Sequence, residues 1–83
     1  MIMNLYSIND STAGEYGQPA PMNNDAVAVR SFGTLVNEKG TIMNTKPSDF
    51  SIWKVGTFDT ETGTILPIQP EKLANGDSLV QEE

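Results

Sequence analysis

The residues that could do chemistry in this 83-residue chain are aromatic and basic side chains that stand close together. Phe50, Trp53 and Lys54 fall within one short stretch. On a sheet, aromatic rings can stack on single-stranded bases while cations contact phosphates. Core packing is the other use of such a stripe, and the commoner one. Three further candidates for nucleic-acid or partner binding are Tyr6, Tyr16 and Arg30, whose simpler interpretations are core packing, loop anchoring and solvation.

The chain lacks the residues on which common catalytic sites depend. It has no histidine and no cysteine, so the usual nucleophilic triads, zinc sites and disulfides are excluded. No two carboxylates stand in an apolar setting that would suit one as acid and the other as base. The run from Asp59 to Gly63 loosely resembles a calcium loop but lacks the terminal bidentate Glu, so it indicates a turn. We therefore expect a protein that is not an enzyme and binds no metal or cofactor.

The composition describes a small acidic chain. Five Lys and Arg residues face eleven Asp and Glu residues, for a formal net charge of −6. That balance argues against binding driven by attraction to a phosphate backbone. No apolar run approaches the ~20 residues that cross a bilayer, and no secretory signal is evident. Small domains without disulfides often gain stability by oligomerising. We therefore expect a homodimer without membrane contact.

The elements that must position these side chains begin with a predicted hairpin over residues 50–68. Aromatic and β-branched residues fill its first strand, as suits a pleated surface. Asp59 and Gly63 frame a tight turn with a closing bulge. Pro67 has no N–H to donate, which predicts that the return strand lies at a sheet edge.

Two face patterns are open for the first strand of this hairpin. Strict alternation puts Phe50 and Phe58 on one face and Trp53 and Val55 on the other. A bulge at Gly56 would shift the phase and gather Trp53, Val55 and Phe58. Either pattern leaves apolar surface that one short helix does not cover, so we expect a partner subunit there.

The chain before the hairpin is predicted to form a strand, a loop and a helix. Residues 1–8 are apolar on both faces, which indicates an interior strand. Residues 9–24 are rich in Gly, Pro, Ser and Asn, which predicts a long loop without regular structure. Residues 25–37 carry apolar side chains at spacings of three and four, and Asn24 or Asp25 can cap their start, so a helix is expected.

The remaining segments are predicted to be mostly irregular. Residues 38–48 form a second loop, in which residues 41–43 could add a short strand. Residues 70–74 can make one helical turn, because Pro is favoured at the first helical position. We expect a single small domain over residues 1–73 and an acidic flexible tail over residues 74–83.

These elements predict an α+β fold. A small antiparallel or mixed sheet, built from the N-terminal strand and the C-terminal hairpin, is packed by one helix. The alternative is a small all-β barrel, in which residues 26–36 would be a strand.

An ordered set of short phrases also runs along the chain. It comprises NLYSI with Asp10, Gly14-Glu15-Tyr16-Gly17 with Pro19, Ala28-Val29-Arg30-Ser31-Phe32, Pro47-Ser48-Asp49-Phe50, Trp53-Lys54-Val55-Gly56, Phe58-Asp59 and Thr62-Gly63. No single phrase is specific. The set covers residues 1 to about 73 and resembles the non-structural protein of gokushoviruses, single-stranded DNA bacteriophages of the Microviridae.

The resemblance implies a non-virion protein made in the host bacterial cytoplasm. It implies a role in replication or packaging of a single-stranded DNA genome, exerted by DNA binding, but it supplies no binding residues. The alternative hypothesis is a protein–protein interaction module that docks on phage replication or capsid proteins without direct DNA contact.

Overall fold

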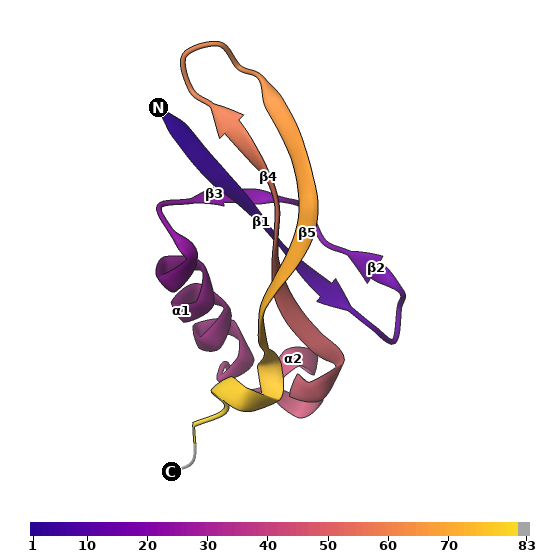
Figure 1. Cartoon of the computed structure of the whole chain (residues 1–83). Helices are drawn as coiled ribbons and strands as arrows, with labels where there is room; N and C mark the ends of the chain where they lie inside the picture. The colour runs from indigo at the N-terminus through magenta and orange to yellow at the C-terminus, as the bar shows by residue number, and fades with distance from the viewer. Residues whose placement is uncertain (82–83) are drawn as a thin grey trace.

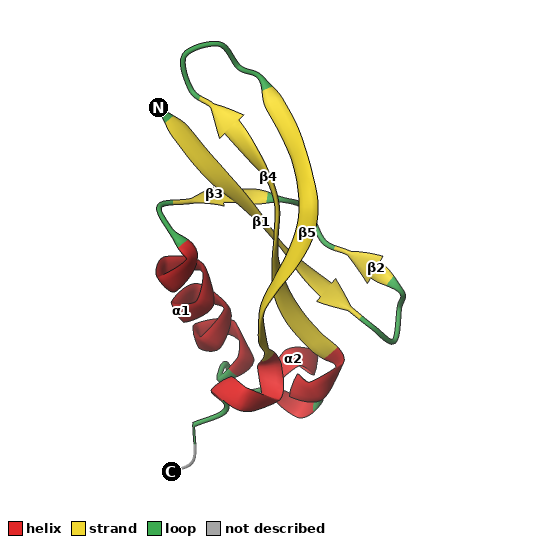
Figure 2. Cartoon of the chain, viewed as in Figure 1, coloured by secondary structure: helices red, strands yellow, loops and turns green. Residues whose placement is uncertain are grey.

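The structure, a computed structural model, describes residues 1–81 and shows an open sheet with one main helix on one face (Figure 1, Figure 2). The elements follow in the order β1 (Ile2–Asp10), β2 (Glu15–Tyr16), β3 (Ala20–Met22), α1 (Asp25–Val36), α2 (Ile42–Thr45), the 3₁₀ helix η1 (Pro47–Asp49), β4 (Phe50–Asp59), β5 (Ile65–Asn75) and the 3₁₀ helix η2 (Gly76–Leu79). The five-stranded sheet is antiparallel and runs β2-β1-β4-β5, and β3 also pairs with β1. The predicted α+β fold is confirmed. The barrel alternative is wrong, because residues 25–36 form a helix.

α1 forms where its start is capped and its apolar stripe meets the sheet. The Asn24 side chain accepts a hydrogen bond from the Val27 N–H at 2.9 Å, which satisfies one donor of the first turn. The buried positions are Ala28, Phe32 and Val36, spaced by four residues so that they share one face. The helix therefore presents one narrow apolar stripe, and that stripe covers one face of the sheet.

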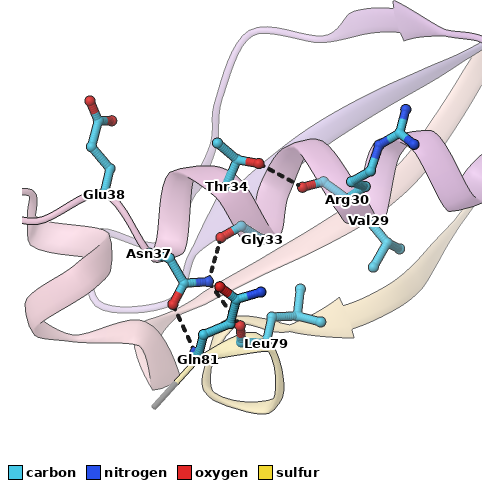
Figure 3. A pocket seen from close by; sticks show the side chains of 8 residues that line it. All are labelled: Val29, Arg30, Gly33, Thr34, Asn37, Glu38, Leu79 and Gln81. Carbon is cyan, nitrogen blue, oxygen red and sulfur yellow. Dashed lines mark hydrogen bonds between the residues drawn. The ribbon is translucent and has the colours of Figure 1, made fainter. Parts of the chain in front are cut away.

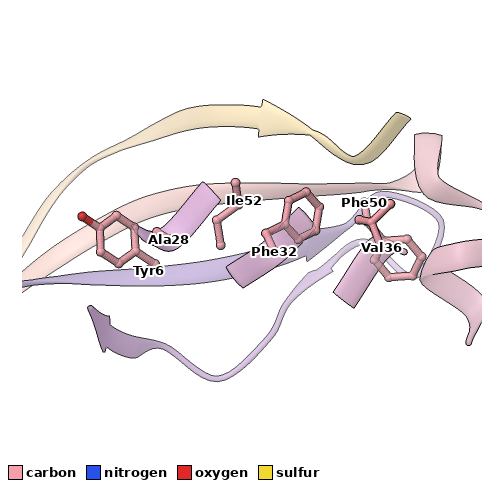
Figure 4. Packing of buried hydrophobic residues seen from close by; sticks show 6 residues of the cluster. All are labelled: Tyr6, Ala28, Phe32, Val36, Phe50 and Ile52. Atoms are coloured by element: carbon pink, nitrogen blue, oxygen red, sulfur yellow. The ribbon is translucent and has the colours of Figure 1, made fainter. Parts of the chain in front are cut away.

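The core lies between that stripe and the strand residues that face it (Figure 4). Its members are Tyr6, Ala28, Phe32, Val36, Phe50 and Ile52. Full burial of an aliphatic or aromatic side chain stabilises a fold by about 1.5–3 kcal/mol. This core lies on one face of the sheet, and within residues 1–81 the opposite face has no covering helix.

The predicted hairpin is confirmed as β4, a tight turn and β5. The Gly63 N–H donates to the Asp59 carbonyl at 2.8 Å, and the Asp59 N–H donates to the Thr64 carbonyl at 2.9 Å. Gly63 has a φ of 75°, a left-handed conformation that glycine adopts without strain. Pro67 lies in β5, which is the edge strand as predicted.

A bulge at Val55 shifts the faces of β4. Tyr6 lies opposite Lys54 and Leu5 lies opposite Gly56, so Val55 has no partner on β1. Beyond the bulge, Phe58 joins the face of Trp53, because these two residues lie opposite Met3 and Ser7, which share a face of β1. The bulge pattern is therefore right for Trp53 and Phe58, and strict alternation is wrong.

Gly56 is required beside this bulge. A Cβ added there would lie 2.7 Å from the Leu66 carbonyl oxygen of β5, closer than real Cβ contacts come. The close approach of β5 to β4 at this point therefore depends on a residue without a side chain.

The long loop predicted over residues 9–24 is wrong in one respect, because it contains β2 and β3. The Asp10 carboxylate accepts hydrogen bonds from the N–H groups of Thr12 at 3.0 Å and Ala13 at 3.3 Å. Gly14 then adopts a φ of 73°, and the chain turns back along the edge of β1 that β4 leaves unpaired. Pairing with that edge gives regular structure to a segment whose composition indicates none.

The segment over residues 38–48 is helical rather than partly extended. Residues 42–45 form α2, so the strand considered at residues 41–43 is wrong. Thr41 explains the difference, because its Oγ1 accepts a hydrogen bond from the Asn44 N–H at 3.1 Å and caps the turn.

The C-terminal segment is also more regular than predicted. Residues 70–74 belong to β5 and not to a helical turn, because pairing with β4 outweighs local propensity. The boundary predicted after residue 73 falls inside β5, and Leu79 of η2 packs against the core. Gly76 is buried, and a side chain there would collide with the Pro47 carbonyl. The last residues of the predicted tail, 82 and 83, lie outside the described residues.

Candidate nucleic-acid interface

The face of the sheet opposite α1, which we call the open face, carries the candidate site. Its side chains come from alternate residues of the paired strands, and the register places them in cross-strand rows. From the α2 end toward the hairpin turn, these rows are Asn9–Ser51–Asn75, Ser7–Trp53–Lys72, Leu5–Gly56–Pro67 and Met3–Phe58–Ile65. Tyr16 of β2 lies opposite Asn9 and extends the first row.

The chemistry of the open face changes along its length. The rows near α2 are polar or aromatic, whereas those near the hairpin turn hold Met, Leu, Phe, Ile and Pro. Lys72 is the one charged residue in the rows, which contain no Asp or Glu. The Asp and Glu residues that make the chain acidic therefore lie outside these rows.

Tyr16, Trp53 and Lys72 form a cluster, which we call the Trp53 platform. The rings of Tyr16 and Trp53 meet edge to face, with centroids 5.7 Å apart and planes at 78°. The Lys72 Nζ lies 5.7 Å from the Trp53 ring centroid, within the range of a cation–π contact. The Trp53 indole N–H donates to Ser51 Oγ at 2.8 Å, which holds the ring in place. Tyr16 is 48% exposed, so an incoming planar group can reach its ring.

The platform unites two of the six predicted site residues, and the other four lie elsewhere. Tyr16 and Trp53 lie together on the open face. Tyr6 and Phe50 are 1% and 7% exposed in the core, so neither can stack on a ligand in the folded chain. Phe50 precedes Trp53 by three residues and so points to the opposite face. The predicted stripe of Phe50, Trp53 and Lys54 on one surface is therefore wrong.

Lys54 lies on the α1 side of the sheet, in a polar network at the start of the helix. Its Nζ is 3.2 Å from Asp25 Oδ2 and 3.8 Å from Glu71 Oε2. The Tyr6 hydroxyl donates to Asp25 Oδ1 at 2.7 Å and accepts from the Asn4 amide at 3.2 Å. The network ties the first turn of α1 to β1, β4 and β5, which is a structural role.

The network shifts two pKa values. Burial raises the pKa of Tyr6, and its hydrogen bond to Asp25 raises it further. The hydrogen bond from Tyr6 lowers the pKa of Asp25, partial desolvation opposes that effect, and Lys54 lowers it again. Asp25 also stands in the first turn of α1, where the helix dipole favours a negative charge.

Arg30 is exposed on α1 and lines a hollow of about 660 Å³ (Figure 3). The Asn37 amide nitrogen donates to the carbonyls of Gly33 at 2.7 Å and Leu79 at 2.9 Å. Its oxygen accepts from the Gln81 N–H at 2.8 Å. The hydrogen bonds of Asn37 thus join the C-terminal segment to the helix beside the hollow. Arg30 points away from these groups. Because α1 covers the other face, Arg30 is not part of the platform.

Lys72 was not among the sequence-derived candidates. The sequence predicts a helical turn for its segment, which does not align it with Trp53. An edge strand tolerates Pro67 and Pro70, so a return strand extended past both prolines would have placed Lys72 opposite Trp53.

Among residues 1–81, no group of three or more potential ligand side chains gathers where a metal ion could be held. Within the same residues, no helix has the length and apolar character of a membrane span.

Comparison with known proteins finds a family model. The model described as Phage ORF5 protein matches residues 3–79, which run from the second residue of β1 to the end of η2. No curated protein and no solved structure matches the chain.

Proposed function

Because the chain belongs to the Phage ORF5 protein family, we propose that it binds single-stranded DNA on its open face during replication or packaging of a phage genome. The finer assignment to the gokushoviruses of the Microviridae is supported by the ordered phrases of the sequence. We propose a binding role rather than a catalytic one, in the cytoplasm of the host bacterium.

The observation that carries this proposal is the Trp53 platform. Two aromatic rings and one cation meet on a sheet face whose rows hold no acidic residue. Proteins that bind single strands without sequence preference combine stacking rings with cations along the backbone. The absence of acids from these rows reconciles such binding with the net charge of −6.

Stacking supplies most of the binding energy in this proposal. One stacked base contributes about 1–3 kcal/mol. Two rings then give about 2–6 kcal/mol, which corresponds to weak binding by a single copy. Lys72 adds one phosphate contact, and the amides of Asn9 and Asn75 beside the platform offer hydrogen bonds to bases or sugars.

Trp53 makes the proposal directly testable, because it is the single tryptophan of the chain. Titration with an oligothymidylate at low salt should quench its fluorescence, since a base would stack against the platform. Tyr16→Leu should weaken binding by about fivefold or more, the equivalent of one lost stacking contact. Tyr16→Phe keeps the ring and is the matched control. Failure of the oligonucleotide to bind at low salt, or equal losses in both variants, would contradict the proposal.

A second candidate function is docking on phage replication or capsid proteins without DNA contact. The apolar rows toward the hairpin turn favour it, because they hold neither cations nor hydrogen-bonding side chains. Pull-down of the phage replication initiator and scaffold proteins tests it, and retention of neither would count against docking.

A further inference from the structure

The end of the sheet nearest the β4–β5 turn projects beyond α1 (Figure 1). The helix begins at Asp25, which bonds Tyr6 and Lys54, and it ends at Val36 beside Phe50. Strand residues on the other side of Tyr6 and Lys54 therefore have no helix over them. This projecting end is where the rows of the open face are apolar.

A patch of five residues covers that part of the open face, and we call it the hairpin patch. Its members are Met3, Leu5, Phe58, Ile65 and Pro67, which lie in the two cross-strand rows nearest the turn. Ile65 is 65% exposed, whereas Leu5 is only 8% exposed because its neighbours surround it. The patch contains no charged or hydrogen-bonding side chain, so it suits neither a phosphate nor a polar ligand.

The dimensions of the molecule indicate that surface is left uncovered. A folded monomer of this 9.0 kDa mass is expected to expose about 4,850 Å², whereas the chain exposes 5438 Å². Its radius of gyration is 13.2 Å, against about 11.8 Å expected for this length. The excess of roughly 600 Å² approaches the ~800 Å² per partner that a standard interface buries.

We propose that a second copy of this chain packs face to face on the hairpin patch. A two-fold interface sets a patch against itself, and an uncharged patch brings no like charges together even in an acidic chain. Addition of a strand to the β5 edge is disfavoured, because Pro67 and Pro70 lack the N–H groups that pairing requires. Packing between faces is then the remaining way to cover the patch with another sheet. The Trp53 platform of each copy stays outside this interface, so the dimer does not depend on the proposed DNA binding.

Sedimentation equilibrium of the full chain tests this interface. The unmodified protein should have twice the 9.0 kDa chain mass at micromolar concentration. Ile65→Asp should raise the dimer dissociation constant by about 100-fold or more, because a charge would be buried without a partner. Leu66→Asp is the matched control: Leu66 is 57% exposed and lies opposite Thr57, on the other face of β5, so the mass should stay that of a dimer.

Several outcomes would overturn the proposal. One is a chain that stays monomeric at 100 µM or above. Another is dissociation by Leu66→Asp as complete as by Ile65→Asp. A monomer that forms a complex with a phage protein, lost in Ile65→Asp, would assign the patch to that protein instead. Circular dichroism of both variants separates dissociation from unfolding, and a fold lost only in Ile65→Asp would also refute the assignment of Ile65 to an exposed surface.

Discussion

Single-stranded DNA bound on the open face should show an unusually weak salt dependence. Lys72 is the one cation in the rows, so about one phosphate is neutralised. The slope of log K against log salt is then about −0.7, and affinity falls about 2.6-fold between 50 and 200 mM salt. A face with four such cations would lose about 50-fold. Repulsion between DNA and a chain of net charge −6 weakens as salt rises, which flattens the slope further.

Two substitutions separate the effect of where a positive charge lies from the effect of the net charge of the chain. Lys72→Ala and Arg30→Ala each remove one positive charge, but Lys72 stands over Trp53 whereas Arg30 is exposed on α1. We expect Lys72→Ala to bring the slope close to zero and to weaken binding at every salt concentration. Arg30→Ala should leave the slope unchanged, because it adds only a distant, screened repulsion.

Fluorescence anisotropy of a labelled oligothymidylate at several salt concentrations between 50 and 200 mM measures these slopes. Tryptophan quenching in the same samples shows whether the strand reaches Trp53. A fall in affinity of tenfold or more for the unmodified protein would refute the reasoning, since it requires several phosphate contacts. A slope altered by Arg30→Ala and not by Lys72→Ala would place the DNA on the helical side.

Two further predictions concern the scaffold. Gly56→Ala should destabilise the chain by more than about 1 kcal/mol, because its Cβ would lie 2.7 Å from the Leu66 carbonyl; Gly33→Ala, whose Cβ would meet Leu79 at 3.9 Å, should stabilise α1 by about 0.5–1 kcal/mol. Urea denaturation measures both, and equal effects would refute the close approach of β5 described at Gly56. Asp25 has a pKa lowered from 3.8, chiefly by the Tyr6 hydrogen bond, so the stability it contributes is present above pH 3.8 and is lost as the pH falls through the lower, folded-state pKa. Asp25→Asn should therefore lower stability at pH 7 by on the order of 1 kcal/mol and flatten the acid limb of urea midpoints between pH 6 and 2; an unchanged acid limb would show that Asp25 is not the titrating group.

Features set by neighbours in sequence could be predicted. The cap at Asn24, the stripe of Ala28, Phe32 and Val36, and the turn from Asp59 to Gly63 each depend on contacts within a few residues. Local chemistry therefore determines α1 and the hairpin, and both are confirmed.

Features set by distant pairing could not be predicted in the same way. β2 and β3 exist because β1 offers a free edge, and Lys72 reaches Trp53 because β5 pairs along β4 far beyond the turn. The face of Phe58 depends on a bulge that composition indicates at Gly56 but that only the register locates at Val55. Tyr16 and Trp53 of the platform follow from residue types, whereas Lys72 follows from strand alignment.

The unequal distribution of charge between the two sides of the sheet has a consequence for crowded DNA. A strand held against the rows that contain no Asp or Glu would turn the acidic exterior of the protein toward solvent. Neighbouring coated strands would then repel one another at distances up to about 8 Å in physiological salt. Such a coat would keep newly made genomes separate, which a basic binding protein, able to bridge two strands, would not do.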